Sequence, residues 1–198
     1  MNRVAVQYAW LKLKAQTLLV FARPRHALQV FERMLEFRPH DSYALASCAH
    51  LHAANHDFPR AVACLQARVQ NAPDASAWFN LAYVLQQAGR QVEAEAAFRQ
   101  AIANDERMDR AWYGLGLALV HRQEFDEAAA AFRKAAVLQP MSPHPWYRLA
   151  EVCLVMGRHD EVHEVLQHLK QFEPKVAARL ERQAQLQRHE TGVFHAAH

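Results

Sequence analysis

Glycine and cysteine are both scarce in this chain, whose 198 residues include only five of the first and three of the second. With so little glycine and no low-complexity linker, no internal segment has the composition of a disordered region. The three cysteines, Cys48, Cys64 and Cys153, are scattered and form no CxxC pair. We interpret them as small buried side chains in a reducing compartment, which predicts a cytoplasmic protein.

Sequence signatures of catalysis are also missing. There is no glycine-rich phosphate loop, no HExxH and no GxSxG. Neighbouring carboxylates such as Asp126 and Glu127 come at predicted helix starts, where they complement the helix dipole. The sequence therefore predicts a protein that is not an enzyme, needs no cofactor and has no small-molecule substrate.

Long uncharged hydrophobic runs do not occur. The most apolar stretch, residues 4–22, carries Lys12 and Lys14 in its middle. Each lysine would cost roughly 2.5–3.5 kcal/mol at the centre of a bilayer, so a membrane span is not predicted. The first residues also lack the ordered basic, apolar and small-residue regions of a cleavable signal.

Acidic residues are rare near the N-terminus. Through Arg38 there are seven basic residues and two acidic ones, a charge of +5 compared with +3 for the whole chain. A basic end attracts acidic proteins, anionic membranes or nucleic acid. Because no nucleic-acid motif accompanies the charge, we favour a solvated cap, and a membrane or nucleic-acid adaptor stays the alternative. The predicted helix over residues 4–21 is apolar on more than one face, so we also expect self-association or docking there.

What the sequence does contain is a unit that recurs about every 34 residues. Its clearest copy, residues 109–142, predicts one helix over 110–122 and a second over 125–138, followed by a proline. The apolar positions of the two helices are Trp112, Leu115, Gly116, Leu119, Ala128, Phe132 and Ala135. On a wheel of ~100° per residue each set forms one stripe, so the two helices pack face to face. In this packing Gly116 lets the helices approach and Trp112 fills the remaining core.

The order Trp-x2-Leu-Gly, Ala-x3-Phe and closing Pro in this copy resembles the tetratricopeptide repeat. Five such units are predicted, over residues 8–41, 42–74, 75–108, 109–142 and 143–175. A single unit is too small to bury its apolar surface, so the units must stack on one another. The predicted fold is all-α, a right-handed α-solenoid of about five helix pairs and a C-terminal capping helix.

The predicted capping helix covers residues 175–189. It resembles the terminal helix that such arrays need for solubility, and its apolar stripe is Val176, Leu180 and Ala184. One domain is expected over residues 1–190, followed by a disordered tail over residues 191–198.

The resemblance implies a concave surface, formed by the outward faces of the first helices, that holds a peptide or helix of a partner protein. The residues placed there are Phe79, Asn80, Tyr83, Gln87, Arg110, Tyr113, Leu117, His121, Tyr147, Arg148 and Glu151. Exposed aromatic side chains beside arginine are typical of interface hot spots. The alternative is that these aromatics only pack against neighbouring units. The predicted function is a non-catalytic adaptor or scaffold.

The same family includes two other functions. One is a secretion-type chaperone for a hydrophobic client, similar to the tetratricopeptide chaperones of type III translocators. Those chaperones usually have three repeats, whereas five are predicted in this chain. The other is the subfamily that binds the C-terminal carboxylate of heat-shock chaperones, which Asn80 and Arg110 match. Its remaining positions hold Ala46, His50 and Gly114, so that specific activity is not predicted.

Thirteen histidines raise the question of a metal site. His159 and His163 lie four residues apart on a predicted helix, as do His52 and His56. Two ligands on one helical turn are fewer than the three or four that a zinc site needs. His159 also takes the packing position of Phe125 in the preceding unit, so a structural role and no metal are predicted.

Overall fold

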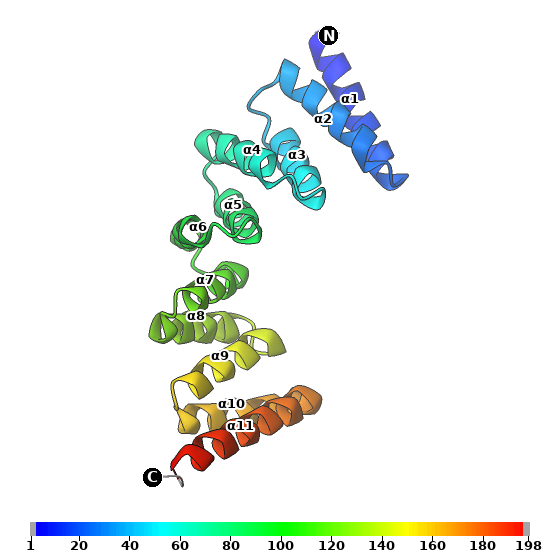
Figure 1. Cartoon of the computed structure of the whole chain (residues 1–198). Coiled ribbons are helices and arrows are strands. Elements are labelled where there is room, and N and C mark those ends of the chain that lie inside the picture. Colours follow the sequence, from blue (N-terminus) through cyan, green and yellow to red (C-terminus); the bar gives the residue numbers. More distant parts are fainter. Residues whose placement is uncertain (1–2, 196–198) are drawn as a thin grey trace. The chain divides into compact units, whose positions relative to one another are not determined.

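The computed structural model describes the backbone of residues 3–195 and the side chains of residues 5–185. Within this range the regular structure is entirely helical and consists of the eleven helices shown in Figure 1. They are α1 (Arg3–Val20), α2 (Pro24–Phe37), α3 (Ser42–Ala54), α4 (Phe58–Asn71), α5 (Ala75–Gln87), α6 (Gln91–Asn104), α7 (Asp109–His121), α8 (Phe125–Leu138), α9 (Pro143–Val155), α10 (His159–Phe172) and α11 (Pro174–His195). Five consecutive pairs followed by a C-terminal helix confirm the predicted all-α fold.

The helices fall into two compact units. The N-terminal unit, Met1–Asp105, contains α1 to α6, and the C-terminal unit, Glu106–His198, contains α7 to α11. The single domain that the sequence predicts over residues 1–190 is not tested by this division and stays a prediction. The boundary falls where Glu106 takes the place of the proline that closes the other four repeats. Glutamate does not fix φ as proline does, so this connection lacks a restriction that the others have.

Aspartate side chains cap three helices of the N-terminal unit, and one of them, Asp57, caps α4 by accepting a hydrogen bond from the Arg60 N–H at 3.3 Å. The Asp41 carboxylate accepts a hydrogen bond from the Ala44 N–H at 2.8 Å, and Asp74 accepts one from Ala77 at 2.6 Å. Such caps satisfy amide groups that a helix start leaves without a partner, and each stabilises the helix by ~1 kcal/mol. The Asp41 and Asp74 caps begin α3 and α5 at the first residues of the predicted repeats.

The two helices of every pair are joined by the same left-handed turn. One residue in each turn has a positive φ, namely Ala22 (52°), His56 (59°), Gly89 (75°), Gln123 (62°) and Gly157 (70°). The residue that follows donates its N–H to a carbonyl five residues back, as Glu124 does to Leu119 at 3.0 Å. This hydrogen bond satisfies a carbonyl at the end of the first helix, but only glycine adopts the conformation without a steric cost.

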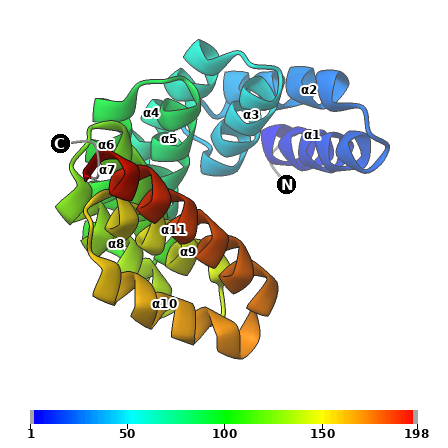
Figure 2. The same cartoon turned by 60° about the horizontal axis from the view of Figure 1, so that its bottom comes forward.

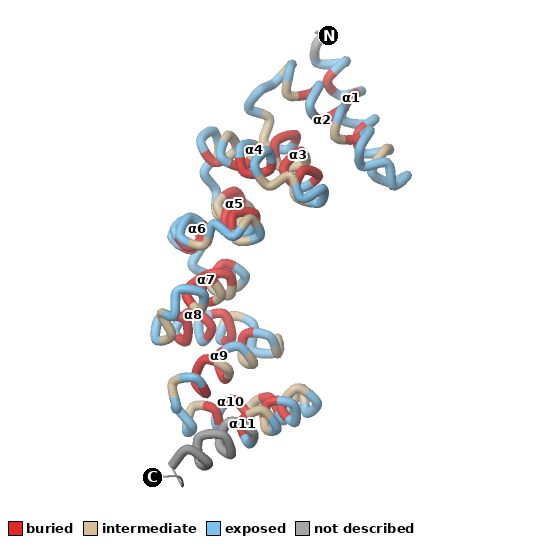
Figure 3. Tube along the Cα trace, in the orientation of Figure 1, coloured by how far each residue is buried: buried red, intermediate tan, exposed pale blue. Residues whose placement is uncertain are grey.

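Bulky side chains at one equivalent position of the second helices form the core of the pairs. They are Phe31, Leu65, Phe98, Phe132 and Leu166, and none is more than 8% exposed. Figure 3 shows the buried residues concentrated where the helices of a pair face each other. Full burial of one such side chain contributes ~1.5–3 kcal/mol to the free energy of unfolding.

Gly116 of α7 is required by a close contact with the ring of Phe132. A Cβ atom at this position would lie 2.6 Å from a ring carbon, closer than such atoms approach. The preceding repeat has Ala82 and Phe98 at these positions, and there the Phe98 ring tilts against Phe79 with the centroids 6.0 Å apart. In the fourth repeat the Phe132 ring makes the corresponding contact with Tyr113, and Gly116 leaves the space that a Cβ atom would take.

The tryptophans take a different place from the one predicted. Trp112 is only half-buried, and its indole N–H donates a hydrogen bond to the carbonyl of Glu106 at 2.9 Å. Trp146 repeats this arrangement with the carbonyl of Pro140, also at 2.9 Å. The interpretation of Trp112 as the filler of the core is therefore wrong, because Phe132 fills that space. The indole instead ties the first helix to the connection that precedes it.

The last helix, α11, packs against α9 and α10, as Figure 2 shows. Its buried side chains are Ala177, Leu180 and Ala184. An ion pair between Lys170 and Glu181, at 2.6 Å, adds a polar contact with α10. Val176 was expected in the apolar stripe but is only half-buried, because the stripe that contacts the helix pair begins one residue later.

The described part of α11 continues past residue 191, where the sequence predicts a disordered tail. Extending an existing helix costs much less than starting one, so the residues after 191 continue the helix as far as His195. The last three residues of the expected tail, 196–198, lie outside the described residues.

Replacing Gly116 by alanine should lower the free energy of unfolding by about 1–3 kcal/mol, because the buried Phe132 ring has little room to move away. Adding Phe132→Leu should recover part of this loss, since the two changes recreate the Ala150 and Leu166 pair of the fifth repeat. Chemical denaturation of the single and double variants measures the coupling. If the losses in free energy of unfolding of the two single variants simply add up in the double variant, the contact between Gly116 and Phe132 is contradicted.

The left-handed turns predict opposite effects at two equivalent positions of the C-terminal unit. Gln123→Gly should stabilise the protein by about 1 kcal/mol, because glycine relieves the cost of a positive φ. Gly157→Ala should destabilise it by about the same amount or more for the same reason. Both effects are measured by thermal melts of the full chain. A loss of stability in Gln123→Gly would contradict the left-handed conformation of Gln123.

Candidate functional site

The C-terminal unit contains a cavity of about 310 Å³, which we call the tyrosine cavity. Its lining residues are Tyr113 of α7, Pro143, His144, Tyr147, Arg148 and Glu151 of α9, and Val176 and Arg179 of α11. Four of them, Tyr113, Tyr147, Arg148 and Glu151, were predicted from the repeat to line a binding surface. The volume is at the lower end of the range of small ligand pockets, so it suits one or two side chains of a partner.

The two tyrosines occupy equivalent positions in successive repeats, and each is held from one side. The Tyr113 ring is tilted against Phe132 with the centroids 5.6 Å apart. The Tyr147 hydroxyl donates a hydrogen bond to the side-chain oxygen of Gln183 in α11 at 2.9 Å. Both rings are half-buried, so each packs within the unit on one side and lines the cavity on the other. Packing within the unit and lining a binding surface are therefore compatible roles for these two aromatic side chains.

Arg148 is held by two neighbours in the cavity. Its guanidinium pairs with Glu151 at 2.8 Å. A hydrogen bond to the Tyr113 hydroxyl is the main reason why the pKa of Arg148 is raised, and Glu151 adds to this effect. Burial raises the pKa of the Tyr147 hydroxyl, again with help from Glu151, so this hydroxyl stays protonated and acts as a donor. The ion pair and the hydrogen bonds together hold these side chains in place.

A second cavity of about 300 Å³ adjoins the first and shares Tyr113 and His144 with it. Its other lining residues are Asp109, Arg110, Gln139, Ser142 and Pro145. The predicted residue Arg110 therefore lies near Tyr113 but in the adjoining cavity. Leu117, which is half-buried, and His121, which is exposed, lie farther along α7 and line neither of these two cavities.

In the N-terminal unit two of the four predicted residues line a smaller cavity. Phe79 stacks on Tyr83 with the ring centroids 6.4 Å apart and 24° between the planes. Tyr83, which is 51% exposed, and Asn80 line a cavity of about 140 Å³ together with Ala46, Ala49, His50, Ala53, Leu65 and Val84. Gln87 is exposed one turn beyond Tyr83 on α5. Phe79 is committed to packing, and Tyr83 is the aromatic most available to a partner.

Three residues of α11 contribute to the site but were not predicted: Val176, Arg179 and Gln183. The 34-residue period ends before this helix, so they have no equivalents in the repeats. The available signal was the apolar spacing of Ala177, Leu180 and Ala184, which docks α11 on α9 and α10. Once that face is fixed, the neighbouring Arg179 turns toward Tyr147.

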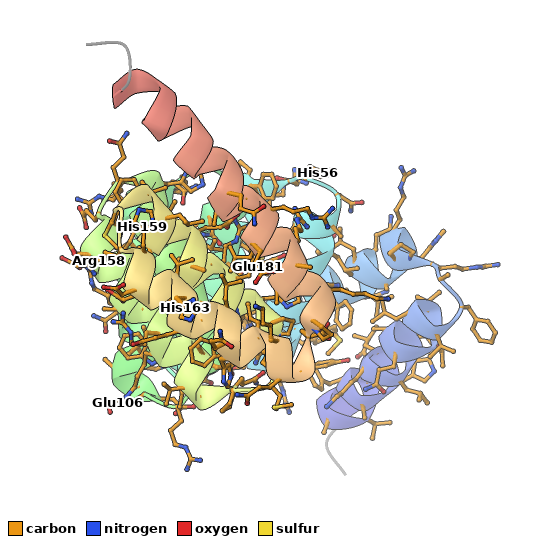
Figure 4. All side chains as sticks on the ribbon, turned by 90° about the horizontal axis from the view of Figure 1, so that it is seen from below. His56, Glu106, Arg158, His159, His163 and Glu181 are labelled. Carbon is orange, nitrogen blue, oxygen red and sulfur yellow. The ribbon has the colours of Figure 1, made fainter. Side chains whose placement is uncertain are left out.

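The histidine pair of α10 lies beside α11. Figure 4 shows His159 and His163 along α10, and a cavity of about 160 Å³ that they line also contains Glu181. Among the residues that the structure describes, no group of three or more His, Cys, Asp or Glu side chains is placed to hold a metal ion. The buried His52 instead lies between two carboxylates, 3.8 Å from Glu32 and 3.6 Å from Asp57.

The cysteines are not activated. Burial is the main cause that raises the pKa of Cys48 to about 12 and that of Cys153 to about 11. Because the thiolate is the reactive form, both thiols are unreactive near neutral pH. All three cysteines, including Cys64, are unpaired in the structure.

The first helix, α1, has two apolar faces. One face, with Tyr8, Leu11 and Ala15, is buried in the core with α2 and α3. The other carries Val6, Trp10, Leu13 and Val20, and Phe21 follows directly after the helix; these side chains are 48% to 81% exposed. The four positions within α1 are spaced by four, three and seven residues, as one side of a helix requires. In the part of the chain that the structure describes, no helix is long and apolar enough to cross a membrane.

Models of the tetratricopeptide repeat match most of the chain. One matches residues 49–107 and 92–143, and a second matches residues 119–186. No curated protein matches the sequence.

Several solved structures share the fold. MamA residues 41–end from Desulfovibrio magneticus RS-1 is 22% identical with a TM-score of 0.73, over 92% of this chain and 98% of that chain. YrrB, described as a TPR protein with an unusual peptide-binding site, is 16% identical with a TM-score of 0.72, over 85% and 88%. TTC0263, a thermophilic TPR protein of Thermus thermophilus, is 22% identical with a TM-score of 0.61, over 90% and 99%. At these identities the similarity establishes the fold alone.

Proposed function

The chain belongs to the tetratricopeptide repeat family, and from this premise we propose that it is a non-catalytic adaptor that holds a peptide or helix of a partner protein. The observation that carries the proposal is the tyrosine cavity. It combines two half-buried tyrosines with Arg148 on the first helices of consecutive repeats. Tyrosine and arginine are the residues that most often dominate the binding energy of an interface.

The chemistry of the cavity favours recognition over reaction. Glu151 is paired with Arg148, and the pKa of Tyr147 is raised, so neither group is poised as a base near neutral pH. YrrB, which has the same fold and is described as having a peptide-binding site, supports peptide binding as the task. The adaptor thus uses pre-positioned side chains to select a partner segment.

A chaperone for a hydrophobic client is favoured less. Holding such a client calls for a large apolar surface, whereas the cavities described above have volumes of about 140 to 310 Å³. The largest of them is lined by Arg148, Glu151 and Arg179 as well as by apolar groups. In the N-terminal unit, Asn80, Tyr83 and the exposed Gln87 offer a second and smaller polar surface to a partner.

Arg148→Gln should weaken binding of the native partner by roughly 1–2 kcal/mol while leaving the melting temperature nearly unchanged. The matched control is Arg133→Gln, because Arg133 is 48% exposed and paired with Glu161, whereas Arg148 is 46% exposed and paired with Glu151. A purified complex identified by mass spectrometry supplies the partner, and calorimetric titration supplies the affinities. Equal affinities for both variants would place the partner elsewhere on the protein.

The outer face of α1 supports a second candidate function, self-association or docking through residues 4–21. Four large apolar side chains on one face of α1, continued by Phe21 just after the helix, form a stripe that is unusual for a solvated surface. Lys14 lies over the Trp10 ring at 5.0 Å from its centroid and edges this stripe with a positive charge. The proposal is separate from the tyrosine cavity, since it concerns only the N-terminal unit.

Trp10→Glu should convert a dimer to a monomer, or abolish a partner complex, because it places a charge in the middle of the apolar stripe. Val137→Glu is the control, since Val137 is an isolated apolar residue of α8 that is 62% exposed while Trp10 is 57% exposed. Sedimentation velocity at a range of protein concentrations reports the oligomeric state. The candidate fails if the unaltered protein is a monomer throughout and Trp10→Glu leaves partner binding intact.

A further inference from the structure

Arg179 of α11 brings an unbalanced positive charge to the tyrosine cavity. Its guanidinium lies 5.5 Å from the centroid of the Tyr147 ring. The neighbouring Arg148 is paired with Glu151 at 2.8 Å, but no described carboxylate forms an ion pair with Arg179. The cavity therefore contains two arginines and one glutamate, and one positive charge is left for a ligand.

The turn of α11 that carries Arg179 is held in place by its neighbours, while the Arg179 side chain itself is exposed. The adjacent Leu180 is fully buried and anchors this turn of α11. Tyr147, on which the guanidinium lies, is itself held by its hydrogen bond to Gln183, one turn farther along the same helix. An arginine that is already oriented loses less freedom when it binds, and its planar fork matches a carboxylate.

The rest of the lining indicates what stands next to the charge. Pro143 and Val176 are apolar, and Tyr113 and Tyr147 present ring surface. A cavity of about 310 Å³ has room for an acidic group and one apolar neighbour, not for a long segment. The arginine supplies the ion pair, and the apolar walls supply contacts for the neighbouring side chain.

We propose that the tyrosine cavity binds a carboxylate of the partner segment through Arg179, beside an apolar residue that contacts Pro143 and Val176. This inference rests on the proposed peptide-binding function and adds the chemistry of the bound residue. It makes the helix that follows the repeats part of the binding site. The arrangement differs from the heat-shock carboxylate site considered from the sequence, whose cations come from the repeats themselves.

The probes are synthetic eight-residue peptides chosen from a random library by binding to the full chain. Each selected peptide is compared with versions in which Asp or Glu becomes Asn or Gln, and with versions whose C-terminus is amidated. We expect one of these changes to weaken binding about tenfold, and which one it is distinguishes a side-chain carboxylate from a chain end. In Arg179→Gln the acidic and neutral versions should bind equally, whereas Arg179→Lys should keep part of the preference.

Arg182→Gln is the matched control, because Arg182 is an exposed arginine of the same helix that does not line the cavity. It should retain the full preference for the acidic peptide. Peptides that bind with no preference for a carboxylate, or a preference that survives in Arg179→Gln, would overturn the inference and leave the adaptor function standing. If no peptide of any composition binds, the peptide-binding function fails and the inference fails with it. Thermal melts of all variants verify that they are folded.

Discussion

The contact between a bulky side chain of each second helix and a small residue of the first is the interaction on which the rest of this structure depends. The small residues, Ala15, Ala49, Ala82, Gly116 and Ala150, lie at equivalent buried positions of the five first helices. This contact is especially close in the fourth pair, because the Phe132 ring occupies the volume of the Cβ atom that Gly116 lacks. Within each unit, a pair that lost this contact would lose the surface on which its neighbours stack.

Because the core contact uses one face of each first helix, the opposite face is available for other contacts. Tyr113 and Tyr147 lie between the two, with part of each ring packed and part lining the cavity. Rings supported in this way give a large contact area with little loss of rotamer entropy on binding. The packing that stabilises the C-terminal unit therefore also prepares the side chains that a partner would meet.

The fold and about half of the candidate site could be predicted from the sequence. A period of 34 residues places Tyr113 and Tyr147 at equivalent positions, and helical geometry then places Arg148 and Glu151 beside them. The contribution of Arg179 could not be predicted, because α11 follows the last repeat and its docking depends on tertiary contacts. A helical wheel also cannot show that an indole N–H reaches a backbone carbonyl, so the place of Trp112 was missed.

The hydrogen bond from Tyr147 to Gln183 has a thermodynamic consequence for the end of the chain. Terminal helices open more readily than the interior of a protein, and opening of α11 would take Gln183 and Arg179 away from Tyr147. A ligand that binds only when these groups are in place draws the population toward the closed form by mass action. Occupancy of the cavity and resistance of the C-terminal helix to proteases then rise together, because both depend on the equilibrium between the open and closed forms of α11.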